Sequence, residues 1–442
     1  MRHVPFVLLL LTAALHAESP PDLRTRKTGS DWPTFLGPTR DGVSPEKGIL
    51  TRWPREGLKV VWEVPMGLGF AAPVVSKGRV FHFDRFGDDN RLSCRTAETG
   101  KLLWKFEYPT DYRDLYGYSP GPRACPMVDD DRVYVYGPEG MLHCLTVADG
   151  KVAWSIDTVK EYHVHQNFFG VGSVPAVEGD LLIVAVGGSP KGPRPADLRD
   201  AKGNGTGIIA FDKRTGKEVY RITDELASYS SPVLTTIDGR RWCFYFARGG
   251  LVGFEPKTGN VDFHFPWRSK DHDSVNASNP VVVGDKVLLT ECYGPGAALL
   301  KVKPGKCEAV WTDKDKDERR DKSLRCHWNT PIHADGYVYG SSGRHENEAE
   351  LRCVELSTGK VAWSEPNLSR CSLTLIDGHF LCLTERGELI LVKVNPAKYE
   401  PVAKWVMELD HPSWASPVVS NGLLYVRGKD RLICAELIPE KN

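Results

Sequence analysis

The chain has 442 residues, of which 41% are hydrophobic, 26% charged and 10% aromatic, a composition typical of a globular protein with a large core. Lysine and arginine together number 57, as do aspartate and glutamate, so the formal net charge is zero. Without a basic surplus to neutralise a phosphate backbone, the chain is not expected to bind nucleic acid. The 42 glycines and 31 prolines are spread along the sequence, which favours tight turns between short strands over long helices.

The first residues have the pattern of an export signal. A positive start at Arg2 precedes an apolar run over residues 4–15, and Ala17 offers a cleavage point, with cleavage after Ala14 as the alternative. The apolar run is too short to span a bilayer comfortably. We therefore expect a signal peptide over residues 1–17 and a soluble, monomeric chain without a membrane span, exported to the periplasm or secreted.

A repeat with a period of about 40 to 50 residues runs through the chain. One copy opens with AAPVVSKGRVFHF at residues 71–83 and continues with LSCRTAETGKLLW at residues 92–104. Each copy divides into about four short alternating stretches separated by Gly or Asp turns, which predicts a four-stranded antiparallel blade. The opening strand recurs near Pro126, Pro175, Pro232, Pro280, Pro331, Cys371 and Pro417, which makes eight copies.

An all-β, eight-bladed propeller follows, because stacking the blades in a ring covers the apolar faces that an isolated blade exposes. The last unit, residues 415–437, ends before a fourth strand, whereas KVVWEV at residues 59–64 precedes the first full unit. We expect this early segment, with Trp62, to complete the last blade and close the ring. The predicted domains are a lead-in over residues 18–58 with little regular structure and the propeller over residues 59–442.

Eleven cysteines in an exported chain raise the question of disulfides, but the odd count leaves at least one thiol unpaired. Four of them end a Leu-x-Cys step at the same point of the repeat, where a small buried side chain is expected. No CxxC pair indicates a metal or redox site. These four, interpreted as packing residues, are Cys94, Cys144, Cys353 and Cys434.

The repeat resembles the pyrroloquinoline-quinone (PQQ) type: it opens with Ser/Ala-Pro-Val-Val and closes with Thr-Gly-Lys-x-x-Trp, as at residues 99–104. The closing step is similar to the tryptophan-docking motif of quinoprotein dehydrogenases. The lead-in DWPTFLGPTRDG at residues 31–42 resembles the start of exported bacterial PQQ-binding-like propeller proteins. The resemblance covers residues 31–437 and implies the fold. Its relatives include alcohol dehydrogenases, a polymer-oxidising dehydrogenase and a non-enzymatic outer-membrane assembly propeller.

In such a ring, the loops that lead into the innermost strands converge at one mouth of the central channel. Here these loops are rich in histidine, carboxylate, carboxamide and indole groups, which can bind a metal, a small polar ligand or a peptide. The plain alternative is that they only hydrogen-bond one another and water. The loops span residues 114–125, 161–172, 271–279, 325–330 and 410–416.

His163 and His165 alternate on a segment expected to be extended, so they are the best pair for a metal. The full set of candidate ligand-binding residues is His163, His165, Asn167, Asp271, His272, Asp273, Arg325, His327, Trp328, His411 and Trp414.

A dehydrogenase that uses PQQ would need an aromatic platform, a calcium ion held by oxygen ligands, an arginine and a carboxylate base. The candidates are Trp328 or Trp414 as platform, Asp271 or Asp273 as base, Asn276 as ion ligand and Arg325 as cation. The resemblance also implies adjacent cysteines beside the cofactor, and this chain has none. We therefore expect a non-catalytic module that binds a protein, peptide or small polar ligand. A PQQ-dependent alcohol or polymer dehydrogenase with calcium is the alternative.

Overall fold

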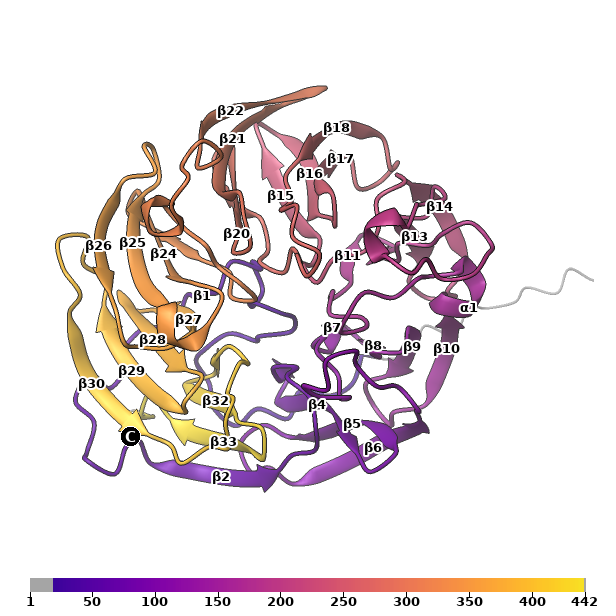
Figure 1. The fold of residues 1–442 in the computed structure, drawn as a ribbon. Helices are drawn as coiled ribbons and strands as arrows, with labels where there is room; N and C mark the ends of the chain where they lie inside the picture. The colour runs from indigo at the N-terminus through magenta and orange to yellow at the C-terminus, as the bar shows by residue number, and fades with distance from the viewer. Residues whose placement is uncertain (1–18, 441–442) are drawn as a thin grey trace, which may run out of the picture.

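A computed structural model describes residues 19–440, in which eight four-stranded antiparallel sheets stand around a central axis (Figure 1). The predicted signal peptide over residues 1–17 lies outside the described residues. The described helices are short: α1 (Thr158–Tyr162) and the 3-10 turns η1 (Leu198–Asp200), η2 (Arg319–Asp321) and η3 (Glu346–Glu348). Within residues 19–440, no helix has the length and apolar character needed to cross a membrane.

The first seven blades follow one another in chain order, and in each blade four consecutive strands run from the axis outward (Figure 1). The first four blades are β3 (Val74–Ser76), β4 (Arg79–Phe86), β5 (Asp89–Thr96), β6 (Leu102–Pro109); β7 (Met127–Asp129), β8 (Arg132–Tyr136), β9 (Met141–Thr146), β10 (Val152–Asp157); β11 (Ala176–Glu178), β12 (Leu181–Ala185), β13 (Ile208–Asp212), β14 (Glu218–Ile222); and β15 (Val233–Ile237), β16 (Arg240–Phe246), β17 (Gly250–Phe254), β18 (Val261–Pro266). The next three are β19 (Val281–Val283), β20 (Lys286–Glu291), β21 (Gly296–Lys303), β22 (Lys306–Thr312); β23 (Ile332–Ala334), β24 (Tyr337–Ser342), β25 (Glu350–Glu355), β26 (Val361–Glu365); and β27 (Cys371–Ile376), β28 (His379–Thr384), β29 (Glu388–Lys393), β30 (Pro401–Val406).

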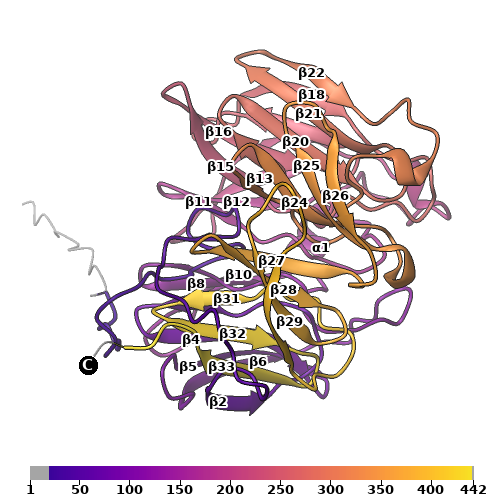
Figure 2. The ribbon, with the colours of Figure 1, turned by 90° about the vertical axis from the view of Figure 1, so that its left-hand side faces the viewer.

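The eighth blade is made from both ends of the chain, as predicted. Its inner strands are β31 (Val418–Ser420), β32 (Leu423–Arg427) and β33 (Arg431–Glu436), and its outer strand is β2 (Val60–Pro65). β2 pairs antiparallel with β33, with Trp62 opposite Cys434 and Val64 opposite Leu432. The side view shows β2 lying beside β33 (Figure 2). The prediction of eight blades closed by an N-terminal strand is therefore confirmed.

An aromatic side chain on the outer strand of one blade docks against the next blade. The Trp62 indole N–H donates to the Ala97 carbonyl of the first blade at 2.9 Å. The same ring covers Gly100, where φ is +70° and an added Cβ would lie 2.8 Å from the indole, so only glycine fits this turn. The contact recurs around the ring: Trp104, Trp154, Trp311 and Trp363 donate to the carbonyls of Val147, Lys213, Leu356 and Asn395 at 2.8–3.1 Å.

The lead-in crosses the axis of the ring and ties several blades together (Figure 1). Trp32 bridges to Val75 in the first blade, and the Arg40 guanidinium donates to the carbonyls of Pro175 and Pro232, 3.1 and 3.4 Å away. Its strand β1 (Val43–Ser44) adds in parallel to β27, as a fifth strand of the seventh blade. The segment thus has little regular structure but many fixed contacts.

The four cysteines of the Leu-x-Cys step are buried free thiols, in line with their interpretation as packing residues. Burial raises the pKa of the Cys94 thiol to about 12, so at neutral pH it stays protonated and inert. All eleven cysteines are unpaired in this structure.

Replacement of Trp62 tests the closure. We expect Trp62→Ala to lower the free energy of unfolding by about 3–5 kcal/mol, because the substitution leaves a cavity at the seam and removes a hydrogen bond. Val61→Ala on the same strand is the control, since Val61 is 39% exposed whereas Trp62 is 9% exposed. Urea denaturation followed by circular dichroism measures both variants, and equal effects would contradict this role for Trp62.

Candidate functional site

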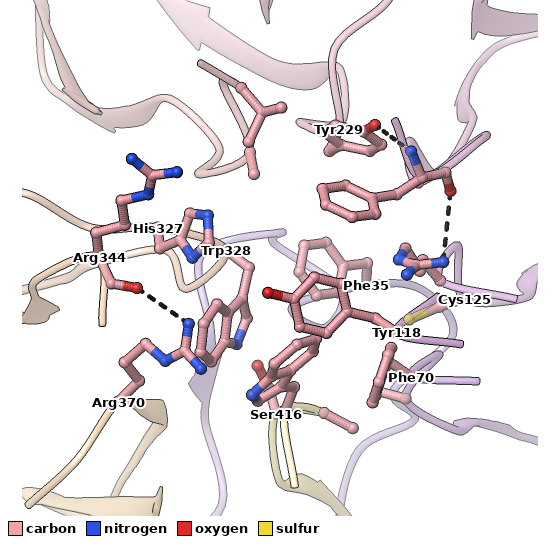
Figure 3. Close-up of a pocket in the computed structure, with 18 of the residues that line it drawn as sticks. Phe35, Phe70, Tyr118, Cys125, Tyr229, His327, Trp328, Arg344, Arg370 and Ser416 are labelled. Atoms are coloured by element: carbon pink, nitrogen blue, oxygen red, sulfur yellow. Dashed lines mark hydrogen bonds between the residues drawn. The ribbon is translucent and has the colours of Figure 1, made fainter. Parts of the chain in front are cut away.

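All five predicted mouth loops contribute to one cavity of about 270 Å³ at the centre of the ring (Figure 3). This convergence confirms the prediction that the loops ahead of the innermost strands meet. The contributing side chains include Tyr116, Tyr118, Arg123, Phe169, Asp273, Val275, His327, Trp328 and Trp414.

The walls of the cavity are mostly aromatic. The ring centres of Trp328 and Trp414 lie 4.7 Å apart, and the ring centre of Phe70 lies 4.4 Å from that of Trp414. Tyr118 lies across the cavity from Trp328, and Phe35 of the lead-in lines it as well (Figure 3). Such a set of ring faces favours planar or apolar groups of a ligand, and the lead-in takes part directly.

Arg370 is held between the aromatic wall and a buried carboxylate. Its guanidinium carbon lies 4.5 Å from the Trp328 ring centre, and its Nε and Nη2 donate to the two Glu385 oxygens at 2.9 and 2.7 Å. Trp414 Nε1 also donates to Glu385, at 3.0 Å. Burial acts to raise the pKa of Glu385, but the Arg370 and Trp414 donors outweigh it and hold that pKa below its ordinary value.

Two further arginines are arranged in the same way. Arg123 lies over the Phe169 ring at 5.1 Å and pairs with the buried Asp114 at 3.1 Å. Arg344 lies over the Tyr293 ring at 4.5 Å, with Asp273 3.5 Å away. Each guanidinium near the cavity therefore has its own carboxylate, so the local charge is balanced while unused N–H groups remain for a ligand.

His327 places a neutral imidazole on the wall. The Tyr293 hydroxyl and His327 Nε2 are 2.8 Å apart, and Nδ1 has no hydrogen-bond partner. Burial lowers the pKa of His327 to about 3, so the ring stays uncharged at neutral pH. The Cys125 thiol also lines the cavity, and burial raises its pKa to about 12, so it is not a nucleophile at neutral pH.

The expectation of an extended segment at His163 and His165 is wrong. Residues 158–162 form α1, because the Asp157 carboxylate caps it by accepting from the Lys160 N–H at 2.9 Å. His163 then ends the helix with a left-handed backbone, φ +54°. His165 and Asn167 instead line a second, small cavity, separate from the central one.

The remaining candidates lie around the central cavity but do not line it. Asp271 and His272 are exposed, and His272 Nδ1 lies 3.3 Å from Asp197 of the long insertion. Arg325 is buried and donates to the Cys292 carbonyl at 3.0 Å. His411 is exposed, 3.7 Å from Glu346 and 4.0 Å from Glu385.

Several lining residues escaped the sequence analysis. Arg370 and Phe70 lie just before the opening strand of a blade, which is the position that defines the predicted mouth loops. The sequence therefore contained a signal for these two residues. Arg344 follows β24, and Tyr293 follows β20, at the far end of the second strand of a blade. No repeat signal marks those positions, and Phe35 lies outside the repeat altogether.

Eight sheets closed by an N-terminal strand, with recurrent tryptophan docking, define a PQQ-like β-propeller. The family model described as "Outer membrane protein assembly factor BamB" matches residues 46–192 and 88–365, and the chain belongs to this family.

Quinohemoprotein alcohol dehydrogenases and BamB are among the proteins that this chain resembles. Quinohemoprotein alcohol dehydrogenase ADH-IIG of Pseudomonas putida is 26% identical over 157 residues, which are 34% of this chain and only 19% of that protein. Among solved structures, BamB of Moraxella catarrhalis has a TM-score of 0.55 at 12% identity and covers 87% of this chain and 99% of its own. Quinohemoprotein alcohol dehydrogenase of Comamonas testosteroni has a TM-score of 0.63 at 14% identity, and the match covers 93% of this chain and 81% of that one. These structural likenesses show the fold alone.

The residues around the central cavity do not fit a quinone held with calcium. Calcium takes six to eight oxygen ligands. The carboxylates beside the cavity, Asp114, Asp273 and Glu385, each lie within 3.5 Å of an arginine nitrogen. Glu346, Glu385 and His411 form a cluster of potential metal ligands. Both of its carboxylates are already paired, because Arg386 binds Glu346 and Arg370 binds Glu385. The aromatic faces suit a flat ring, but none of these carboxylates is free of an arginine to hold the cation.

The Arg370–Glu385 pair yields a stability prediction. We expect Arg370→Met to lower the free energy of unfolding by about 3–5 kcal/mol, because it leaves the Glu385 carboxylate buried without a counter-charge. Adding Glu385→Gln removes that charge and should recover most of the loss. Urea denaturation measures the free energy of unfolding of both variants. A double variant as unstable as the single one would contradict the pairing of Arg370 with Glu385.

A pH dependence follows from His327. The folded chain holds the pKa of His327 at about 3 against an ordinary value of 6.5, so only the unfolded ring takes up a proton near pH 5. The resulting stability is present above about pH 6.5 and is lost as the pH falls, with about 2 kcal/mol lost by pH 5. Urea denaturation measures the free energy of unfolding at pH 7 and at pH 5. We expect this free energy to fall by about 2 kcal/mol less in His327→Gln than in the wild type. An unchanged slope would show that His327 protonates in the folded chain.

Proposed function

We propose that this chain is a non-catalytic, exported binding protein that holds a peptide segment of a partner protein at the mouth of its central channel. The main support for this proposal is the central cavity, in which aromatic faces alternate with ion-paired arginines. Apolar side chains of a peptide stack on such faces, while its carbonyl oxygens accept hydrogen bonds from the guanidinium groups.

Unused donors at the cavity support a ligand rich in carbonyl oxygens. Trp328 Nε1 and His327 Nδ1 are buried atoms without a hydrogen-bond partner. Buried polar atoms normally have partners, and two of them beside one cavity favour an acceptor-bearing occupant such as a peptide backbone.

The rim extends the cavity toward a larger partner. Leu115, Tyr116 and Tyr118 are 60%, 47% and 58% exposed, although large apolar side chains are usually covered. Tyrosine is enriched where proteins meet, because its ring is apolar and its hydroxyl is polar. Membership in the family described as an outer-membrane protein assembly factor agrees with a protein partner.

A random-peptide display library selected on the full chain tests the proposal. Peptides enriched on the wild type, made synthetically and titrated by fluorescence anisotropy, should bind at least about tenfold more weakly to Tyr118→Ala and Trp414→Ala. Tyr118 is exposed, so its replacement should leave the fold intact. Val219→Ala on β14, 55% exposed on the outer side of the ring, is the matched control and should bind as the wild type does.

Two outcomes would overturn the proposal. The first is that no peptide is enriched, or that the enriched peptides bind equally to all the variants. The second is stoichiometric uptake of PQQ with calcium accompanied by alcohol-dependent dye reduction, which would favour the dehydrogenase alternative.

A further inference from the structure

A second cavity of about 20 Å³ lies between the third and fourth blades, beside the central one. Segment 164–173 and residues 227–229 surround it, together with Arg248 after β16. Tyr229 lines both cavities and, with the backbone of residues 169–174, separates them.

Arg248 is a buried cation without an acceptor. The residue is only 4% exposed, and its Nε and Nη1 atoms have no hydrogen-bond partner. Burial lowers the pKa of Arg248 to about 10, which leaves the guanidinium charged at neutral pH. A charge buried in this way is strongly unfavourable unless an opposite charge compensates it.

The surrounding side chains do not supply that charge. None of the residues that line the cavity is acidic. Glu225, in the loop before β15, acts to raise the pKa of Arg248 but makes no ion pair with it, and its carboxylate is instead bound by His264 at 2.6 Å and by the Gly249 N–H at 2.8 Å. Arg268 and Arg194 add positive charge nearby, since each disfavours protonation of a neighbouring group.

A second unpartnered donor points to the same place. The Ser173 hydroxyl lines the cavity, is buried and has no hydrogen-bond partner, and the residue is 2% exposed. Guanidinium nitrogens and a hydroxyl that share one cavity without an acceptor form the donor set of an anion site. The small volume suits a single monatomic ion.

We infer that this cavity binds one chloride-sized anion, held by the Arg248 guanidinium and the Ser173 hydroxyl. The anion completes the contact between the loop at residues 164–173 and the fourth blade. Because Phe169, Gly172 and Val174 of the adjoining segment line the central cavity, the ion also fixes part of that wall. The inference does not depend on which ligand the central cavity takes.

Bromide, a chloride analogue that scatters anomalously, tests the site directly. Crystals of the full chain soaked in sodium bromide should show an anomalous peak within hydrogen-bond distance of Arg248 and Ser173. The absence of an anomalous peak at this position would by itself overturn the inference.

Thermal unfolding supplies an independent test in solution. Sodium chloride titrated against sodium gluconate at constant ionic strength should raise the unfolding temperature of the wild type saturably, by a few degrees. Arg248→Met should lose this chloride dependence, and Ser173→Ala should need several-fold more chloride. Arg344→Gln, which changes a paired arginine at the central cavity, is the control and should keep the dependence. Equal chloride dependence in the wild type and Arg248→Met would contradict the site.

Discussion

The interaction on which this structure depends is the docking of an outer-strand aromatic ring against the next blade. Each blade is too thin to cover its own apolar faces, so it is stable only between two neighbours. The ring must therefore close, and β2 closes it by placing Trp62 against Gly100 of the first blade. Closure also fixes the mouth, because the loops ahead of the inner strands meet only when all eight blades are in place.

Ring closure gives the central cavity its chemistry, because it brings together side chains that are far apart in sequence. Arg123 and Arg370 come from the second and seventh units, and Phe35 comes from the lead-in. The wall combines aromatic faces with balanced ion pairs. Both BamB and quinohemoprotein alcohol dehydrogenases have this fold, so the donor set at the cavity, and not the fold, carries the functional argument.

The repeat made the fold predictable because its signals are local. Gly100 needs a positive φ, Cys94 needs a small buried side chain, and both recur at a fixed spacing. The site was predictable in part: Asp273, His327, Trp328 and Trp414 line the cavity as expected. The histidine pair was not, because the helix capped at Asp157 ends at Tyr162 and leaves His163 with a left-handed backbone, so the chain is not extended there. Such a local capping contact competes with the repeat pattern and is weakly marked in the sequence.

Native-state hydrogen exchange of β2 tests the central claim most directly. If closure holds the ring together, the backbone amides of residues 60–64 that pair with β33 exchange with the same opening free energy as those of Arg431–Glu436, and the two strands open as one unit. Exchange of β2 at a much lower free energy, while β33 stays protected, would show that the ring holds without the N-terminal strand and would contradict the account.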